Sequence, residues 1–402
     1  MKILLINDHI HLSGGGDVVL NSEREYLKQC GYEVFVYSWS TKCTSDDSNV
    51  ILCKESKSKI LRHLTKFCGS WSKRIHFRKT LRLIKPDVIH IHLVSKYPLS
   101  IYPELRGYKV VQTLHGPNLF CATSWGCMKS NSGACSMGIG YKCYKNRCIS
   151  LHEMLAYGLL NYRLVPYLKK YVNYWHCPSR NIQNTAVGLG YSNTVFIPLG
   201  VDKEYHDCIH SGCNKKEKNI LFVGAVAEVK GLVYLYDAFR IVQQKEPAAR
   251  LIIAGSGNLY NYLEKKIKSD NNEKSVELLG KVPHDKVIEL YKSASVFVMP
   301  SIWQEQFGLV GPEALAMGLP VVGSDIGGIP EWLHHGEWGY LVPPRDANGL
   351  ALRILDLLNN PERAHEFGQK GRNFVLEEYN YANYVERMRL LIHSLYEDEN
   401  FS

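Results

Sequence analysis

The 402-residue sequence predicts two α/β domains, each built on a doubly wound sheet of parallel strands with helices on both faces. Three observations lead to this prediction. Short runs of valine, isoleucine and leucine alternate with amphipathic segments along the whole chain. The runs are continuously apolar, as in parallel strands that are buried on both faces. The chain is also too long for one ordinary hydrophobic core and suits two domains of about 200 residues each.

In the first half, the runs expected to be strands are separated by longer stretches of helical character. The strands are KILLIN (2–7), EVFVYSW (33–39), DVIHIHL (87–93), KVVQTLH (109–115) and YWHCPS (174–179). The amphipathic stretch VLNSEREYLKQC after the first strand is followed by Gly31, a suitable residue for ending a helix. This alternation predicts repeated strand–helix units.

The second half repeats the pattern. Its expected strands are VFIPLG (195–200), NILFVGA (219–225), ARLIIAG (249–255), SVELLGKV (275–282), SVFVMPS (295–301) and LPVVGSD (319–325). Because the pattern restarts near Phe196, we expect an N-terminal domain over 1–195 and a C-terminal domain over 196–379. We expect a last helix within 380–402 to pack back on the first domain.

The positive charge is concentrated in one segment. Of the net charge of +9, residues 54–85 contribute eleven Lys/Arg against one acid, Glu55. Apolar residues recur in it at helical spacing, at Ile60, Leu64, Phe67, Trp71 and Ile75. A basic amphipathic helix is typical of binding to an anionic membrane surface. A solvated helix that packs its apolar stripe on its own domain is the alternative. No known nucleic-acid module is present, so nucleic acid is not an expected partner.

The composition, 45% hydrophobic and 22% charged, is that of a soluble globular protein. No run reaches the ~18 apolar residues of a membrane span. The N-terminus enters a strand without the cleavage site of a signal peptide. We therefore expect a cytoplasmic protein, held peripherally at the inner face of the cell membrane.

Twelve cysteines do not suit a disulfide scaffold in a chain of this size and compartment. Five of them fall within 28 residues: Cys121, Cys127, Cys135, Cys143 and Cys148. Their spacing lacks the paired CxxC of common zinc modules. A cysteine-rich loop without metal, a structural metal site and a conditional disulfide all remain open.

In such sheets, ligands bind in the loops that follow the carboxyl ends of strands. Three of these loops carry single candidate features. Gly14–Gly16 follow the first strand and allow a close approach to an anion, or form only a tight turn. His115 ends the fourth strand, where a structural histidine is the alternative. Lys230 could neutralise a phosphate, or be an ordinary solvated lysine.

The fourth loop, WQEQFGLVG, carries more. Glu305 and Glu313 lie on either side of a glycine-containing turn whose amides, around Phe307 to Leu309, could bind an anion. Were the whole segment helical, about 12 Å would separate the two glutamates, roughly the span from a ribose to a sugar across a diphosphate. Carboxylates accept hydrogen bonds from paired hydroxyls. Capping of the helix by these acids is the alternative.

Together these segments resemble retaining glycosyltransferases of family 4, which have the GT-B fold. The most specific segment is EQFGLVGPEALAMGLPVVGSDIGGIPEWL (305–333), which is similar to the family's pattern of two glutamates with seven residues between them, followed by Gly-Gly and Glu. The segments GGGDVVLNSEREYLKQCGYEVFVYS, PDVIHIH and VVQTLHG follow the family's order. The resemblance covers nearly the whole chain and implies two Rossmann-like domains that face each other across a cleft.

The resemblance implies a nucleoside-diphosphate sugar as co-substrate and no required cofactor. Glu313 would hold the ribose, and Glu305 the hydroxyls of the transferred sugar. His115 would contact the sugar near the reacting carbon, so His115 and Glu305 are the expected catalytic residues. The other expected donor-binding residues are Gly15, Gly16, Lys230, Gly257, Val282, Phe307, Gly308 and Leu309. The metal ligands are unknown, with Cys121, Cys135, Cys143 and Cys148 as a possible structural cluster.

One residue departs from the family's pattern. Ala225 stands where an arginine usually pairs with the lysine, so one diphosphate cation is missing unless Arg180 or Lys281 replaces it. No plausible D-x-D motif follows a strand, so we expect transfer without a metal ion, and the resemblance implies retention at the anomeric carbon. We expect a lipid-linked glycan acceptor in surface polysaccharide or glycolipid synthesis. A non-catalytic partner subunit and a sugar-nucleotide epimerase are the alternatives.

Overall fold

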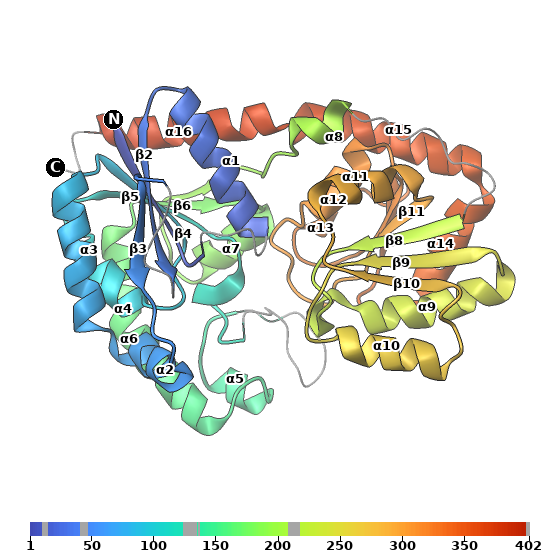
Figure 1. Cartoon of the computed structure of the whole chain (residues 1–402), viewed down its shortest axis with the longest axis horizontal. Coiled ribbons are helices and arrows are strands. Elements are labelled where there is room, and N and C mark those ends of the chain that lie inside the picture. The colour runs from blue at the N-terminus through green and yellow to red at the C-terminus, as the bar shows by residue number, and fades with distance from the viewer. Residues whose placement is uncertain (10–14, 41–46, 124–134, 136, 208–217, 399–402) are drawn as a thin grey trace. The chain divides into compact units, whose positions relative to one another are not determined.

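The computed structural model describes residues 1–9, 15–40, 47–123, 135, 137–207 and 218–398. The chain divides into two compact units. The first domain comprises Met1–Pro198 and Val385–Ser402, and the second comprises Leu199–Tyr384. Each is a parallel sheet with helices on its faces (Figure 1), which confirms the predicted fold class.

In the described part of the first domain, the strand order is β3-β2-β1-β4-β5-β6-β7, and all neighbours are parallel. The strands are β1 Lys2–Asn7, β2 Glu33–Ser40, β3 Val50–Lys54, β4 Val88–Leu93, β5 Lys109–Thr113, β6 Tyr174–Cys177 and β7 Thr194–Phe196. The order reverses between β1 and β4, which makes this pair the switch point of the sheet.

Helices cover both faces of this sheet. Their bounds are α1 Gly15–Gln29, α2 Lys59–Cys68, α3 Trp71–Ile84, α4 Pro98–Ile101, α5 Tyr141–Lys145, α6 Leu151–Tyr171, α7 Arg180–Gly188 and α16 Tyr381–Glu397, with 3₁₀ turns at Tyr102–Glu104 and Pro117–Leu119. Successive side chains of β1 point to opposite faces. Ile3 packs in one apolar cluster with Ile392 of α16, while Leu4 packs in another with Phe77 of α3. Both faces are therefore buried.

The second domain has the strand order β10-β9-β8-β11-β12-β13, again parallel throughout the described residues. Its strands are β8 Lys218–Val223, β9 Ala249–Ala254, β10 Val276–Gly280, β11 Val296–Met299, β12 Val321–Ser324 and β13 Gly339–Val342. Its helices are α8 Lys203–Asp207, α9 Leu232–Lys245, α10 Tyr260–Ser269, α11 His284–Ser293, α12 Val310–Ala316, α13 Ile329–Trp332, α14 Ala347–Asn359 and α15 Pro361–Glu378, with a 3₁₀ turn at Glu228–Lys230. Here β8 and β11 form the switch point (Figure 1).

Some elements differ from the prediction. The strand expected at 195–200 as the start of the second half is β7, which pairs with β6 in the first sheet. The strands β3 and β13 were not predicted, because VILCK and GYLV are only five and four residues long. Gly31, the predicted end of the first helix, does have the positive φ, 83°, that favours glycine.

The basic segment 54–85 is two helices rather than one. α2 and α3 are separated at Gly69, whose φ of 81° cannot continue a right-handed helix. Ile60, Leu64 and Trp71 are 74%, 54% and 69% exposed, while Phe67 and Ile75 are partly buried against the domain. The expected apolar stripe is therefore divided between solvent and core.

The described helices do not include one that combines the length and the apolar character needed to cross a membrane. The longest, α6, has 21 residues and carries polar side chains along its length, including a lysine pair in its last turn.

The N-terminus of α6 is held by a capping box between Ser150 and Glu153.

Candidate functional site

The candidate site of the second domain lies at the switch point, where the loops after β8 and β11 run side by side. Ile302 donates a backbone hydrogen bond of 2.8 Å to the carbonyl of Val229. Gly231 has a φ of 69°, and a Cβ atom there would lie 1.8 Å from the carbonyl oxygen of Pro300. Only glycine allows this approach. The two loops are thus tied together, and one carries Lys230 while the other carries Glu305.

Lys230 and Glu305 form a largely buried ion pair. The Lys230 Nζ lies 2.5 Å from Glu305 Oε1, and the Ser301 hydroxyl donates to the same oxygen at 2.6 Å. The ammonium also lies 4.9 Å from the ring centroid of Trp303. Glu305 is 4% exposed, and a buried carboxylate needs such partners to offset its lost hydration. The structure therefore brings together two residues that the sequence places 75 positions apart.

The Gly-Gly pair downstream supports the backbone of Glu305. Gly327 has a φ of 62°, and a Cβ atom there would lie 2.4 Å from the Glu305 carbonyl oxygen. Gly328 donates its amide hydrogen to that same oxygen at 2.7 Å. The glycines of the signature thus have a physical reason: they let the chain after β12 pack directly on the turn that presents Glu305.

The turn between the two glutamates carries backbone amides for which the structure shows no acceptor among the described residues. Gly308 has a φ of 81°, and the Phe307 carbonyl accepts a 2.6 Å hydrogen bond from the Trp332 ring nitrogen. Within the described residues, no hydrogen bond from the amides of Phe307, Gly308 or Leu309 is found. The helix α12 begins only at Val310, so Glu305 precedes it in a loop. The spacing of about 12 Å, which assumes one continuous helix, does not apply.

Glu313 lies on α12 in a cluster of aromatic residues that the sequence did not predict. Tyr291 donates its hydroxyl to Glu313 Oε2 at 3.3 Å, and Tyr205 forms a second side-chain hydrogen bond. Burial raises the pKa of Glu313 to about 7 against the lowering effects of His284 and the two tyrosines. The two tyrosines are 108 and 22 residues before Glu313, so no local pattern could have assigned them to it.

The remaining expected donor residues of this domain lie in neighbouring loops. Gly257 follows β9 and packs on the loop after β8, since a Cβ atom there would lie 2.3 Å from the Val226 carbonyl oxygen. Val282 is half-buried between β10 and α11. Ala225, at the position of the expected arginine, is exposed. Of the two candidate replacements, Lys281 is exposed beside Val282, and the guanidinium of Arg180 in the first domain stacks 4.5 Å from the Phe196 ring centroid.

In the first domain, the structure brings Gly16 and His115 together. A Cβ atom on Gly16 would lie 3.4 Å from the His115 ring, while Gly15 is exposed and free of such contacts. The His115 Nε2 lies 2.9 Å from Nδ1 of His92. Burial, with the nearby charges of His176 and His90, lowers the pKa of His115 to about 3, so its ring is neutral at physiological pH.

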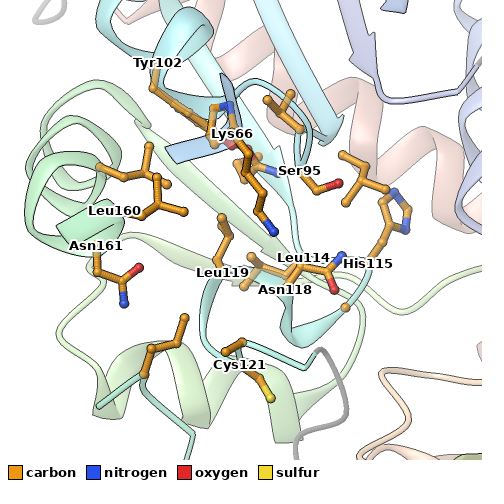
Figure 2. Close-up of a pocket in the computed structure, with 18 of the residues that line it drawn as sticks. Lys66, Ser95, Tyr102, Leu114, His115, Asn118, Leu119, Cys121, Leu160 and Asn161 are labelled. Carbon is orange, nitrogen blue, oxygen red and sulfur yellow. The ribbon is translucent and has the colours of Figure 1, made fainter. Parts of the chain in front are cut away.

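His115 also lines a pocket within the first domain that the sequence did not predict. Its cavity volume is about 180 Å³, and its walls come from the chain after β4 and β5, from α2 and from α6. Figure 2 shows Leu160 and Asn161 of α6 facing His115 across the pocket, with Lys66 extending between them. The Lys66 Nζ also lies 3.2 Å from the Tyr157 hydroxyl. The surface of the pocket is thus polar and apolar in nearly equal parts, so it offers a ligand hydrogen-bonding groups as well as apolar walls.

The cysteine cluster is only partly described, because Cys127 lies outside the described residues. Cys121, Cys135, Cys143 and Cys148 are free thiols. Burial raises the pKa of Cys143, and the charges of its three neighbours add to this effect. Among the described residues, the cysteines do not form a group with ligand atoms within 4.8 Å of one another. The three interpretations of the cluster therefore stay open.

Two parallel sheets of this order, with their loops gathered at two switch points, define the GT-B class of proteins. Residues 13–205 match the profile described as Glycosyltransferase Family 4, and residues 209–374 match Glycosyl transferases group 1. The N-acetyl-α-D-glucosaminyl L-malate synthase of Bacillus anthracis is 30% identical over 323 residues, 78% of this chain and 76% of that protein. This chain belongs to glycosyltransferase family 4.

Other similarities cover either part of the chain or the fold alone. The uncharacterized glycosyltransferase MJ1607 of Methanocaldococcus jannaschii is 36% identical over 172 residues, 43% of this chain and 44% of that protein, so the match spans less than half of its length. The structure of sucrose-phosphate synthase from Thermosynechococcus elongatus superposes with a TM-score of 0.76 at 20% identity, covering 98% of this chain and 99% of that one. Anabaena Alr3699/HepE in complex with UDP-glucose gives 0.73 at 16%, covering 98% and 100%.

The raised pKa of Glu313 predicts a pH-dependent effect of Glu313→Gln. In the folded chain the pKa of Glu313 is about 7, against 4.5 for an unperturbed glutamate. The folded state therefore keeps its full stability below pH 4.5, and the contribution of protonated Glu313 is lost as the pH rises through 7. Glutamine does not ionise, so burying it has no comparable free-energy cost at high pH. Without ligand, Glu313→Gln should be about 3 kcal/mol more stable than the native chain at pH 8 and less than about 1 kcal/mol more stable at pH 5.

Urea unfolding at the two pH values measures this difference. Glu273→Gln is the matched control, because Glu273 is exposed in the same domain. It should change stability equally at both pH values. An effect of Glu313→Gln that is the same at pH 5 and pH 8 would contradict the assigned environment of Glu313.

Proposed function

We propose that this chain is a retaining glycosyltransferase that moves a sugar from a nucleoside-diphosphate sugar to an acceptor hydroxyl. The observation that carries the proposal is the juxtaposition of Lys230, Glu305 and the Phe307–Leu309 amides at the switch point of the second sheet. It offers a cation, an acceptor-only carboxylate and free N–H donors to one ligand. A nucleoside-diphosphate sugar combines an anionic diphosphate with the hydroxyls of a ribose and a sugar.

In this proposal, the roles of the site residues follow from their chemistry. Lys230 and the amides bind the diphosphate, which displaces the ammonium from part of its contact with Glu305. Glu305 then accepts hydrogen bonds from the transferred sugar, and Glu313 accepts them from the ribose. Val282 and Gly257 border the nucleotide, and Gly15, Gly16 and His115 contact the donor from the first domain. The complex of Anabaena Alr3699/HepE with UDP-glucose supports a donor of this class.

The chemical step needs stabilisation of the charge that develops on the leaving diphosphate. Lys230 supplies a positive charge at the place where a metal ion would otherwise act, so we propose that transfer needs no metal ion. The ammonium already lies in a partly dry site, 20% exposed, where its charge is weakly screened. Retention at the anomeric carbon is proposed on family resemblance, with attack from the face that the leaving group vacates.

For the acceptor, we propose that it binds in the pocket lined by His115, Lys66 and Asn161. The pocket offers polar groups to the hydroxyls of a sugar, and Lys66 can pair with an anionic group such as a phosphate. A lipid-linked glycan carries both sugar hydroxyls and such an anionic group. The chain would then act in the synthesis of a surface polysaccharide or a glycolipid.

A membrane-bound acceptor is supported by the helices at the pocket. α2 and α6 pack together through the rings of Phe67 and Tyr157, at 5.2 Å between centroids. α6 leaves Leu155, Leu159 and Tyr162 64%, 56% and 81% exposed, in addition to the exposed apolar residues of α2. These residues lie among lysines and arginines of the segment 54–85. We propose that this basic and apolar surface holds the chain peripherally on an anionic membrane at its cytoplasmic face.

Donor binding tests the proposed function. A UDP-sugar at 100 times its dissociation constant should stabilise the native chain by about 2.7 kcal/mol, and Glu313→Ala should abolish this stabilisation. Lys230→Ala should weaken donor binding by about tenfold to a hundredfold, because a charge-assisted hydrogen bond is lost. Lys265→Ala, an exposed lysine on α10, is the control and should bind like the native chain. The measurement is a thermal shift over a panel of nucleotide-sugars.

Product analysis separates the alternatives. Transfer that persists in EDTA supports the proposal. If the chain neither releases nucleotide nor is stabilised by a donor, the result favours a non-catalytic partner subunit, the alternative that Ala225 suggests. An isomerised free nucleotide-sugar as the sole product would favour an epimerase.

Membrane association is tested by removing exposed apolar side chains from α2 and α6. Leu64→Ser combined with Leu155→Ser and Leu159→Ser should release the chain from phosphatidylglycerol vesicles in a sedimentation assay. Leu352→Ser, 60% exposed in the second domain, is the control. Apolar positions are chosen because Arg74 and Arg78 both pair with Glu104 and are not free to meet lipid. Unchanged sedimentation of the triple variant would contradict this proposal.

A further inference from the structure

A buried polar network underlies His115 in the first domain, where apolar side chains are expected. Its members are Glu23 of α1, His90 and His92 of β4, Thr113 of β5, His176 of β6 and His115 itself. All but His115 are at most 1% exposed. We propose that Glu23, acting through His92, fixes the tautomer of His115, so that Nε2 carries the hydrogen and Nδ1 presents a lone pair to the ligand. The identity of that ligand, a sugar hydroxyl, rests on the proposed function.

One end of the network is fixed by a backbone carbonyl. His176 Nε2 lies 2.8 Å from the Ile197 carbonyl oxygen, which can only accept a hydrogen bond. Burial lowers the pKa of His176 to about 3, so its ring is neutral and Nε2 carries the single hydrogen. Its Nδ1 must then accept. Thr113 Oγ1 lies 2.9 Å away and therefore donates its hydroxyl hydrogen to it.

The next contact follows from this assignment. Thr113 has one hydroxyl hydrogen, so Oγ1 must accept from His90 Nε2, which lies 2.7 Å away. The other nitrogen of His90, Nδ1, lies 2.6 Å from Glu23 Oε1. The contact needs one more proton, either on His90 as an imidazolium or on Glu23 at Oε1. In both cases, Glu23 Oε2 keeps its lone pairs.

Glu23 Oε2 faces the second histidine of the strand. His92 Nε2 lies 3.7 Å from Oε2 and has no hydrogen-bond partner among the residues that the structure describes. A hydrogen on Nε2 is attracted by the lone pairs of Oε2, whereas a lone pair on Nε2 would be repelled. Burial holds the pKa of His92 well below 6.5, so its ring is neutral. With the hydrogen on Nε2, Nδ1 must accept.

Because His92 Nδ1 is a hydrogen-bond acceptor, it determines the tautomer of His115. His115 Nε2 lies 2.9 Å from it, with the two rings stacked at 16°, and donates the hydrogen bond. The neutral His115 ring then has a lone pair on Nδ1. A Cβ atom on Gly16 would lie 3.6 Å from Nδ1, so the glycine keeps this nitrogen uncovered on that side. Nδ1 can accept a hydrogen bond from a hydroxyl, while Nε2 cannot.

A metal ion is the other occupant that these side chains could hold. One ligand atom from each of Glu23, His90 and His92 lies within 4.8 Å of the others. Ligands about 2 Å from zinc in tetrahedral geometry are roughly 3.3 Å apart. The separation of 2.6 Å between His90 Nδ1 and Glu23 Oε1 is shorter than this and is that of a hydrogen bond. The geometry therefore favours a proton.

The tautomer of His115 can be measured directly on the full chain. Long-range ¹H–¹⁵N correlation spectra of ¹⁵N-histidine-labelled protein distinguish the two tautomers, and the His115 signals are those lost in His115→Gln. At pH 7.5 we expect a protonated Nε2 and an unprotonated Nδ1. A hydrogen on Nδ1 of His115 in the native chain would overturn the proposal, as would bound zinc that disappears in Glu23→Gln. This measurement needs no change within the network.

Glu23→Met tests the positioning role. Methionine has a similar length but no oxygen, so the His92 Nε2 hydrogen loses its acceptor whichever group holds the shared proton, and His115 should become a mixture of tautomers. Glu25→Met on the same helix is the control, since the Glu25 side chain is 61% exposed, and it should leave the spectrum unchanged. A His115 tautomer that stays the same in a folded Glu23→Met chain would overturn the role of Glu23.

Activity separates this inference from the proposed function. Where the chain transfers a sugar, Glu23→Met should lower kcat by about tenfold to a hundredfold with donor affinity unchanged, because a contact at the reacting sugar is misplaced while the ribose and diphosphate contacts remain. The expected tautomer without any transfer would support the network and contradict the proposed function. Transfer by a chain with the opposite tautomer would contradict the network alone.

Discussion

The ion pair between Lys230 and Glu305 is the interaction on which the second domain's site depends. Two loops from neighbouring strands meet there, and the pair links them where Gly231 brings their backbones into contact. A buried pair of this kind contributes little net stability, but the loss of one partner leaves the other charge unpaired in a dry place. Each charge therefore stabilises the other in a buried site where neither would be favourable alone. A ligand that binds there exchanges its own groups for contacts that already exist.

The sequence could predict the parts of the site that lie close together in the chain. The spacing of Glu305 and Glu313, the glycine turn between them and the strand before them are local features, and the structure has all of them. It could not predict that Lys230 lies against Glu305, because that contact depends on which strands become neighbours. Tyr205 and Tyr291 were missed for the same reason. Each is an ordinary aromatic residue until the fold places it beside Glu313.

The fold itself was largely predictable, because a strand buried on both faces appears in the sequence as a continuous run of apolar residues. KILLIN is such a run, and its bounds are those of β1. The errors lie where that signal is weak. β3 and β13 are edge strands of four or five residues, and β7 has three half-buried residues, so its run could not show which sheet it joins. The basic segment was misread as one helix because Gly69, which interrupts it, was not weighed against the helical spacing around it. Glycine at a positive φ overrides periodicity.

The first domain carried a signal of a different kind that sequence reasoning passed over. In DVIHIHL two histidines alternate with apolar residues in a strand buried on both faces, so His90 and His92 must point to the same side of the sheet. Burying two imidazoles costs free energy unless partners satisfy them. The partners come from Glu23, Thr113 and His115, which are distant in the chain. A polar pair at this spacing in an otherwise apolar strand is therefore an indication that a site lies nearby, and the buried groups serve it by holding the half-buried His115 in a single tautomer.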